Sequence, residues 1–386
     1  MIMKDKTKYV KHDSFIDLSI NIKQNEKLFF NNLKEICYDK NNLIDLNDYQ
    51  IDIFKRARKD LFELIEPSKD TFAIKENVIK EINTLENKDI PKYLFHRYRY
   101  EIFPKTKELD DYPPYIQIEP SSVCNYRCVF CYQTDLNFTK KSNGFMGKMS
   151  LEMFKGIVDQ VQGNVEFISL ASRGEPLLCP KIDEMLEYTV GKFLNLKINT
   201  NASLLSEKNS HVLLSSGIKT IVFSADAADE KLYSKYRVNG NLNKVLRNIE
   251  KFREIKEKHY SKKKIITRVS GVKVSEDQKM EDMEGLWGGL VDQVAFVDYI
   301  PWENVYDSPV SNINEPCSDL WRRMFIWFDG KINPCDVDYR SELSTGNFKN
   351  ENINNLWNSI NYNSLRENHL NKKRQTKGPC NKCVVV

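Results

Sequence analysis

Nine cysteines stand out in this chain of 386 residues, because seven of them fall into two spaced groups. The first group is Cys124, Cys128 and Cys131, with the spacing C-x3-C-x2-C. Three thiolates so near in sequence can bind one metal centre, since no long loop must close to bring them together. A [4Fe–4S] cluster with three cysteine ligands keeps one iron open for a substrate or cofactor. Zinc with a fourth ligand elsewhere is the alternative, but no histidine lies near and the spacing favours iron–sulfur.

The second group has the spacing C-x17-C-x44-C-x2-C near the end of the sequence and consists of Cys317, Cys335, Cys380 and Cys383. Four thiolates complete a closed [4Fe–4S] site that leaves no iron open. A zinc ribbon with four cysteine ligands is the alternative, and taken alone it is the commoner use of such a set. Of the two remaining cysteines, Cys37 lies in an amphipathic stretch, where we expect a small, inert core residue. The other, Cys179, follows the second strand described next.

Alternating strands and helices must position the first group. We predict strands at residues 115–118, 165–170, 196–199, 220–224, 265–272 and 294–299. Helical segments separate several of them, at 150–162, 180–192, 207–216 and 241–258. This alternation predicts right-handed βαβ units and a parallel sheet. A closed eight-stranded barrel takes about 250 residues, so we predict an α/β fold with a partial, six-stranded (β/α)6 TIM-like barrel.

The segments on either side of the barrel differ from it. The first part is polar with helical periodicity, and we expect its basic, aromatic stretch 93–100 to form a solvated helix face. Near the end, Asp329-Gly330 between two β-like runs predicts a hairpin, followed by a helix over 352–370. We therefore expect a helical extension over 1–110, a barrel over 111–305 and a small hairpin-plus-helix cluster module over 306–386.

Composition excludes several classes of protein. The 58 basic and 54 acidic residues leave a net charge of +4, which is too balanced to predict nucleic-acid or membrane-surface binding. The sequence shows no export signal and no apolar run of about 18 residues that could span a membrane. We therefore expect a cytoplasmic protein whose clustered cysteines hold metal rather than form disulfides.

The first cysteine loop resembles the signature of the radical S-adenosylmethionine (SAM) enzymes, which is C-x3-C-x-aromatic-C after the first strand of a partial barrel. Phe130 stands at the aromatic position, which in that family lies beside the adenine. The run 173–176 (RGEP) is similar to the family's GGEP motif, with Arg173 in place of the first glycine. The resemblance implies that Gly174 and Glu175 meet the methionine ammonium group of SAM.

Two later positions extend the resemblance. Ser224, at the end of the fourth strand, matches a ribose-contacting position of the family, and Arg237 resembles the arginine that meets the SAM carboxylate. The family uses an electron from the reduced cluster to cleave SAM, and the resulting 5′-deoxyadenosyl radical takes a hydrogen atom from the substrate. This implies an external electron donor such as flavodoxin or ferredoxin. Some epimerases of the family return a hydrogen atom from a cysteine thiol, which makes Cys179 a candidate; an inert loop thiol is the alternative.

The C-terminal cysteines resemble those of the Twitch domain, a short relative of the SPASM domain, and this implies one auxiliary [4Fe–4S] cluster besides the SAM-binding cluster. Their spacing is similar to that of 2-deoxy-scyllo-inosamine dehydrogenase in the same family. The resemblance implies oxidation or epimerisation of a sugar, aminocyclitol or nucleotide-linked sugar, free or carrier-bound. Two alternatives stay open: a maturase acting on a ribosomally made peptide, and a non-catalytic zinc-stabilised binding protein. The sequence leaves the oligomeric state open.

Overall fold

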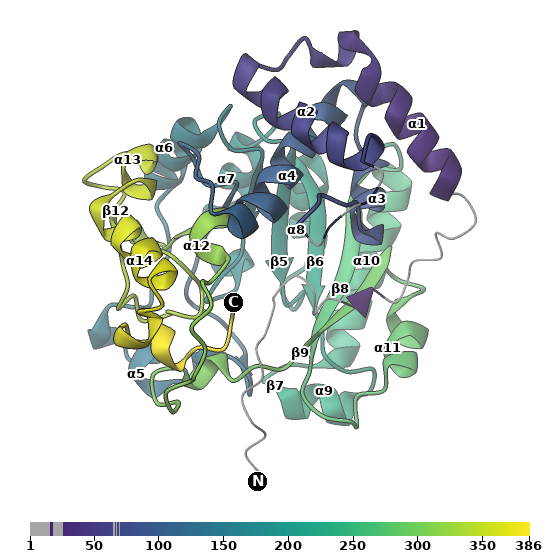
Figure 1. Cartoon of the computed structure of the whole chain (residues 1–386). Coiled ribbons are helices and arrows are strands. Elements are labelled where there is room, and N and C mark those ends of the chain that lie inside the picture. Colours follow the sequence, from purple (N-terminus) through teal and green to yellow (C-terminus); the bar gives the residue numbers. More distant parts are fainter. Residues whose placement is uncertain (1–15, 18–25, 65, 67, 69) are drawn as a thin grey trace.

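An open, mostly parallel sheet forms the centre of the protein (Figure 1). The computed structural model describes residues 16–17, 26–64, 66, 68 and 70–386. Six parallel strands lie in the order β2 (Tyr115–Ile118), β4 (Phe167–Leu170), β5 (Asn195–Thr200), β6 (Ile218–Ser224), β8 (Ile266–Lys273) and β9 (Gln293–Asp298). The prediction of a six-stranded partial barrel is therefore confirmed.

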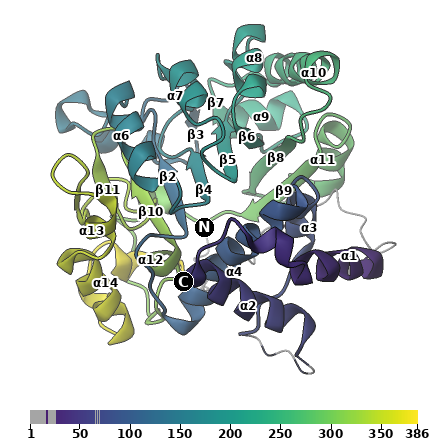
Figure 2. The same ribbon diagram turned by 90° about the horizontal axis from the view of Figure 1, so that it is seen from above.

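Helices cover the outer face of this sheet (Figure 2). They are α6 (Leu151–Val161), α7 (Ile182–Tyr188), α8 (Glu207–Ser215), α9 (Glu230–Tyr236), α10 (Leu242–His259) and α11 (Met280–Trp287). Successive residues of a strand point to opposite faces. Ile168 and Ile198 belong to the apolar core beneath the helices. The alternate residues Ser169 and Lys197, which are register partners, therefore point to the inner face.

The N-terminal extension is helical and lies at the end of the sheet where the strands begin (Figure 1). Its helices are α1 (Glu26–Tyr38), α2 (Asp48–Phe62), α3 (Glu76–Ile82) and α4 (Ile90–Thr106). On α4, His96 stacks on Phe167, the first residue of β4, with 3.8 Å between ring centroids. Arg99 forms a buried ion pair with Glu166 at 3.3 Å.

The prediction of a solvated face at residues 93–100 is therefore wrong. Tyr93, Leu94, Phe95 and Tyr100 are all buried. Aromatic residues occur on every side of this helix, so it is enclosed by the other N-terminal helices and the barrel rather than lying on the surface.

The C-terminal module adds its hairpin to the barrel sheet. Strands β10 (Arg323–Ile326) and β11 (Lys331–Asn333) are antiparallel, and Gly330 in their turn has a φ of +87°. The hairpin is confirmed, but β10 also pairs in parallel with β2, which the sequence did not predict. Strand β12 (Gly346–Asn347) follows β11 in the sheet.

The other short elements complete the description. The predicted helix over 352–370 is two helices, α13 (Ile353–Trp357) and α14 (Ile360–Leu370), because the Ser359 side chain caps a new helix. Further elements are α5 (Leu136–Thr139), α12 (Asp319–Arg322), the two-stranded pair β3 (Arg127–Cys128) and β7 (Arg237–Val238), and β1 (Ile16–Asp17), which pairs with β9. No helix in the described ranges is long and apolar enough to cross a membrane.

Candidate active site

One cavity of about 450 Å³ lies where the barrel strands end. Its lining includes every residue predicted to contact the first cluster or SAM: Cys124, Cys128, Phe130, Cys131, Gly174, Glu175, Ser224 and Arg237. These residues come from the loops after β2 and β4, from the end of β6 and from β7. The carboxyl ends of parallel strands are the usual ligand side of such folds. Cys179, the candidate hydrogen-atom donor, is not among the lining residues.

The three thiols of the first group form no disulfide bond. Burial is the largest influence on the pKa of each of them. Burial raises the pKa of Cys128 to about 12, while the positive charge of Arg237 lowers it. Burial also raises the pKa of Cys124, against a hydrogen bond from the Tyr126 amide, which lies 3.4 Å from the Cys124 Sγ. A buried thiolate needs a compensating positive charge, which a bound metal supplies. The site therefore fits a metal cluster.

The geometry of the group differs from that of a single-ion site. Within the ranges that the structure describes, no three His, Cys, Asp or Glu side chains are arranged to hold one metal ion. A [4Fe–4S] cluster puts each thiolate on a different iron, so its ligands spread around the cluster rather than converge on one point. Cys124, Cys128 and Cys131 all line the one cavity.

Gly174 lets the loop after β4 lie directly against the cysteine loop. A Cβ at this position would lie 2.4 Å from the Ser121 carbonyl oxygen and 2.5 Å from that of Val123. The next residue, Glu175, donates its amide to the Val123 carbonyl at 2.9 Å. Only glycine fits this contact, because real Cβ atoms do not approach backbone oxygens so closely.

The carboxylate of Glu175 is buried and joins two loops. It accepts hydrogen bonds from the Thr200 hydroxyl at 2.7 Å and from the Asn201 amide at 2.8 Å. Burial raises its pKa, and these hydrogen bonds lower it. The carboxylate thus fixes the loop after β5 beside the cysteine loop. Its predicted contact with the SAM ammonium group stays a prediction.

Arg237 is brought to the cluster loop by the backbone pairing of β7 with β3, in which it lies opposite Cys128. Its Nη1 lies 3.9 Å from the Cys128 Sγ, and its guanidinium carbon lies 5.8 Å from the centre of the Phe130 ring. Its Nε forms a buried ion pair with Asp226 Oδ2 at 2.5 Å. The sequence analysis missed Asp226. Its position, two residues past the end of β6, indicates the ligand side of the sheet, where an acidic side chain is a candidate site residue.

Cys179 lies outside the cavity. Its side chain is 2% exposed and packs in the barrel core. Its Sγ lies 3.9 Å from both the Met149 carbonyl oxygen and the Met185 sulfur. The residue lies on the loop after β4 as expected, but the loop turns this thiol inward. Its role as a hydrogen-atom donor stays a prediction, and the inert thiol stays the alternative.

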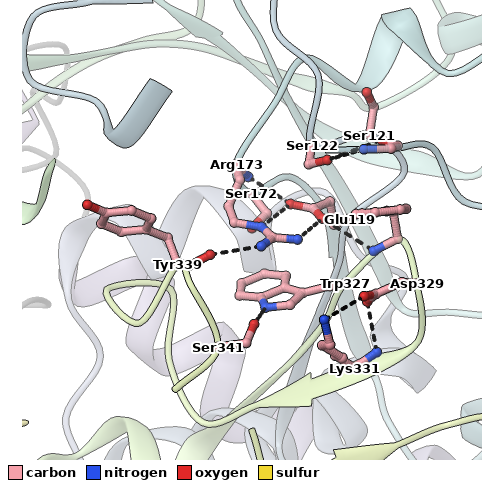
Figure 3. Close-up of polar contacts among 12 residues, drawn as sticks. Glu119, Ser121, Ser122, Ser172, Arg173, Trp327, Asp329, Lys331, Tyr339 and Ser341 are labelled. Atoms are coloured by element: carbon pink, nitrogen blue, oxygen red, sulfur yellow. Dashed lines mark hydrogen bonds and ion pairs between the residues drawn. The ribbon is translucent and has the colours of Figure 1, made fainter. Parts of the chain in front are cut away.

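Arg173, which departs from the family motif, joins this loop to the C-terminal module (Figure 3). Its Nε donates to Glu119 at 2.7 Å and its Nη1 donates to the Tyr339 carbonyl at 2.9 Å. The guanidinium carbon lies 4.2 Å from the centre of the Trp327 ring. Glu119 also accepts the Phe328 amide at 3.2 Å. Arg173 is 2% exposed and Glu119 is fully buried, so this ion pair is an internal link between barrel and module.

A buried arginine binds the backbone of two cysteines of the second group. Arg374 donates to the carbonyl of Cys380 at 3.1 Å and to that of Cys383 at 2.8 Å. Burial raises the pKa of Cys317 to about 11, with Asp319 adding to the rise and Arg374 lowering it. Burial likewise raises the pKa of Cys335, with further contributions from Asp338, Cys380 and Cys317. The four thiols are close enough for the charge of one to raise the pKa of another. This proximity fits ligands of a common cluster.

Comparisons with known proteins agree with this geometry. A family model described as the radical SAM superfamily matches residues 118–283, and the SPASM model, an iron–sulfur cluster-binding domain, matches residues 317–384. GTP 3′,8-cyclase of Clostridium botulinum (strain Hall) is 27% identical over 190 residues, which cover 48% of this chain and 56% of the cyclase. The chain thus spans about half the length of that relative.

Two further proteins are similar. The antilisterial bacteriocin subtilosin biosynthesis protein AlbA of Bacillus subtilis is 25% identical over 157 residues, which cover 40% of this chain and 34% of AlbA. The solved structure of anSMEcpe with bound AdoMet superposes with a TM-score of 0.50 at 16% identity, and the match covers 69% of this chain and 88% of that one. At that identity the likeness supports the fold alone.

Proposed function

Because the chain carries a radical SAM domain followed by a SPASM-type iron–sulfur domain, we propose that it is an oxidoreductase acting on a C–H bond of a small or carrier-bound substrate. The proposed reaction is the dehydrogenation or epimerisation of a sugar, an aminocyclitol or a nucleotide-linked sugar. The two domains imply SAM, a SAM-binding [4Fe–4S] cluster and auxiliary iron–sulfur binding. When bound, these groups supply the hydrogen-abstracting radical and an acceptor for the electron left on the substrate.

The residues of this chain bind and orient those groups. We propose that Cys124, Cys128 and Cys131 hold the SAM-binding cluster and that the four C-terminal cysteines hold one auxiliary cluster. Gly174 keeps the loop after β4 against the cysteine loop. Arg237, fixed by Asp226, is a positive charge beside the cluster loop and can meet the carboxylate of SAM.

One observation carries the proposal that the reaction is an oxidation. The cavity lined by the first cysteine group also includes Asp336, the neighbour in sequence of Cys335. A substrate bound in this cavity would therefore lie near both cysteine groups. This supports an auxiliary cluster that receives the substrate electron rather than one that only stabilises the fold.

Peptide maturation is the second candidate, because AlbA, a bacteriocin biosynthesis protein, is among the similar sequences. The N-terminal extension favours the small-substrate alternative. Its described part from residue 26 to 106 is built of α-helices and short 3-10 turns. It offers no sheet in that range to which a leader peptide could add a strand.

The first experiment is metal analysis of anaerobically purified protein, for which we expect about eight irons from two [4Fe–4S] clusters. Zinc at stoichiometric level without iron would instead support the binding-protein alternative and overturn the enzyme proposal. An iron content near four, lost on substitution of the first group alone, would refute the auxiliary cluster.

Cysteine variants then separate the two groups. Replacing Cys124, Cys128 and Cys131 with alanine should abolish SAM cleavage in the presence of dithionite. Replacing Cys317 and Cys335 should keep SAM cleavage and remove about half of the iron, and product should be lost if the auxiliary cluster accepts the electron. Cys37→Ala is the matched control, because this thiol is buried in the helical extension, far in sequence from both groups.

A further inference from the structure

We propose that the substrate carries an anionic group and that Lys197 binds it on the inner face of the barrel. The inference rests on the proposed function, since it concerns the same cavity, and it narrows the substrate from sugars and cyclitols in general to those bearing a carboxylate or a phosphate.

Lys197 lies in the interior of the cavity, away from the cofactor-side loops. It is on β5 and lines the same cavity as the first cysteine group. Asn201, whose amide is bound by Glu175 beside the cysteine loop, follows it by four residues. At about 3.3 Å per residue of strand, Lys197 lies about 13 Å deeper along the barrel than that loop. A substrate whose reacting carbon faces SAM would extend toward this lysine.

The ammonium group of Lys197 is not paired with a carboxylate. Among the residues that the structure describes, no Asp or Glu oxygen lies within 4 Å of its Nζ, and no hydrogen bond to it is formed. The Nζ lies over the ring of Tyr115, at 5.8 Å from its centre. The ammonium group therefore keeps three donors that no described protein group accepts. A bound anion would accept hydrogen bonds from it.

Two hydroxyl groups flank the lysine and lack partners as well. Ser169 on β4 and Thr220 on β6 are the register partners of Lys197 on its two sides, so all three side chains point to the same face. Ser169 is 0% and Thr220 is 2% exposed. Neither hydroxyl has a hydrogen-bond partner within the described part of the chain. Of these three residues Lys197 lines the cavity, so its ammonium group is the donor that an oxyanion in the cavity can reach.

A second cation, Arg323, lies near Lys197 in the cavity. Arg323 also lines the cavity and lies over the same Tyr115 ring, at 5.3 Å from its centre. Arg323 already has partners, since it donates to the Tyr100 hydroxyl at 2.9 Å and pairs with Asp319 at 3.7 Å. Asp319 is shared with Arg322 at 3.0 Å.

The carboxylate of Asp336 lies in the same cavity, near Arg323. It lines the cavity and is among the groups that raise the pKa of Arg323. Asp298 lines the cavity as well, but no ion pair joins Lys197 to a carboxylate among the described residues. Lys197 is therefore the lining cation that remains for a ligand.

Titration with simple anions tests the inference without any turnover. Sodium phosphate and sodium acetate are titrated into the cluster-loaded protein with SAM, at constant ionic strength, and binding is followed by calorimetry. We expect saturable binding of at least one of them, and the tighter one identifies the anion class of the substrate. Lys197→Met and Lys197→Gln should each weaken that binding by about tenfold or more, as expected for the loss of a charge-assisted hydrogen bond. Lys197→Arg should restore most of it.

Lys208→Met is the matched control, because that lysine is largely exposed outside this cavity. It should bind the anions as the wild type does. The inference is overturned if the wild type binds neither anion up to about 50 mM, or if the Met and Gln variants bind as tightly as the wild type. Failure of the proposed function would appear separately, as missing iron or missing SAM cleavage, both of which are measured on the same preparation before the titration.

Discussion

The buried ion pair between Arg173 and Glu119 predicts a large loss of stability on Arg173→Met. The substitution leaves the fully buried Glu119 carboxylate without its guanidinium partner. Removing one member of a buried pair costs about 3–5 kcal/mol, because the remaining charge is uncompensated. The contact with the Trp327 ring, whose centre is 4.2 Å from the guanidinium carbon, is lost as well, and its contribution is included in that free energy. We expect the free energy of unfolding to fall by about 4 kcal/mol.

A double-mutant cycle separates the pair from the other losses. Arg173→Met, Glu119→Gln and the double variant are unfolded in urea, followed by tryptophan fluorescence and far-UV circular dichroism. Coincident transitions show that one free energy describes the unfolding. The double variant should be less destabilised than the sum of the two single variants, because it leaves no buried charge unpaired. Arg253→Met, which breaks an exposed pair with Glu257, is the control and should change stability little.

The reasoning is refuted if Arg173→Met costs less than about 1 kcal/mol, or if the two single effects simply add. The same variants have a functional readout. Arg173 precedes Gly174 and is held by Tyr339 of the C-terminal module. Arg173→Met should therefore also weaken SAM binding, whereas the Arg253→Met control should not.

Three further outcomes follow from the site and the extension. Gly174→Ala should lower the rate of SAM cleavage by about a hundredfold, because its Cβ would displace the cysteine loop. Gly285→Ala is the control, since it has open space around it and should leave the rate unchanged. Equal rates of SAM cleavage in the two variants would disprove the importance of the Gly174 contact. Cys179→Ala should keep product formation and solvent deuterium incorporation, because the thiol is buried in the barrel core. Loss of either would support its role as a hydrogen-atom donor. Burial, with Arg97 and Arg99, holds the pKa of His96 well below its usual value. The unfolded chain therefore takes up a proton below pH 6.5 that the folded chain does not. The wild type should lose about 1.4 kcal/mol per pH unit relative to His96→Phe between about pH 6.5 and 5, and parallel urea-midpoint profiles would contradict this.

Local patterns predicted the parts of the fold that depend on neighbours in sequence. The six barrel strands and the Asp329-Gly330 turn followed from alternation and turn chemistry. The placement of the predicted cofactor-side residues around one cavity followed from their positions after successive parallel strands. These features need no knowledge of which distant segments meet.

Features that depend on distant segments were missed. The burial of residues 93–100 on α4 depends on Phe167, far along the chain. The pairing of β10 with β2 joins segments about two hundred residues apart. The partners of Arg173, Glu119 and Tyr339, lie in two separate segments. The sequence alone shows only that an arginine replaces the glycine of the motif, whereas the structure shows the contacts that this arginine makes.

The pairing of β10 with β2 has a consequence for how the protein can be cut or recombined. If the chain ended before β10, the strand leading into the Cys124 loop would become an edge strand, with a row of unpaired backbone donors and acceptors. Such edges promote aggregation, so we expect the barrel expressed without its C-terminal module to be insoluble. In the intact chain that side of the sheet ends at β12, which has only two residues and offers little backbone to another molecule. The module thus protects the barrel from self-association, and a chimera should exchange β10–β12 together with the barrel strand they cover.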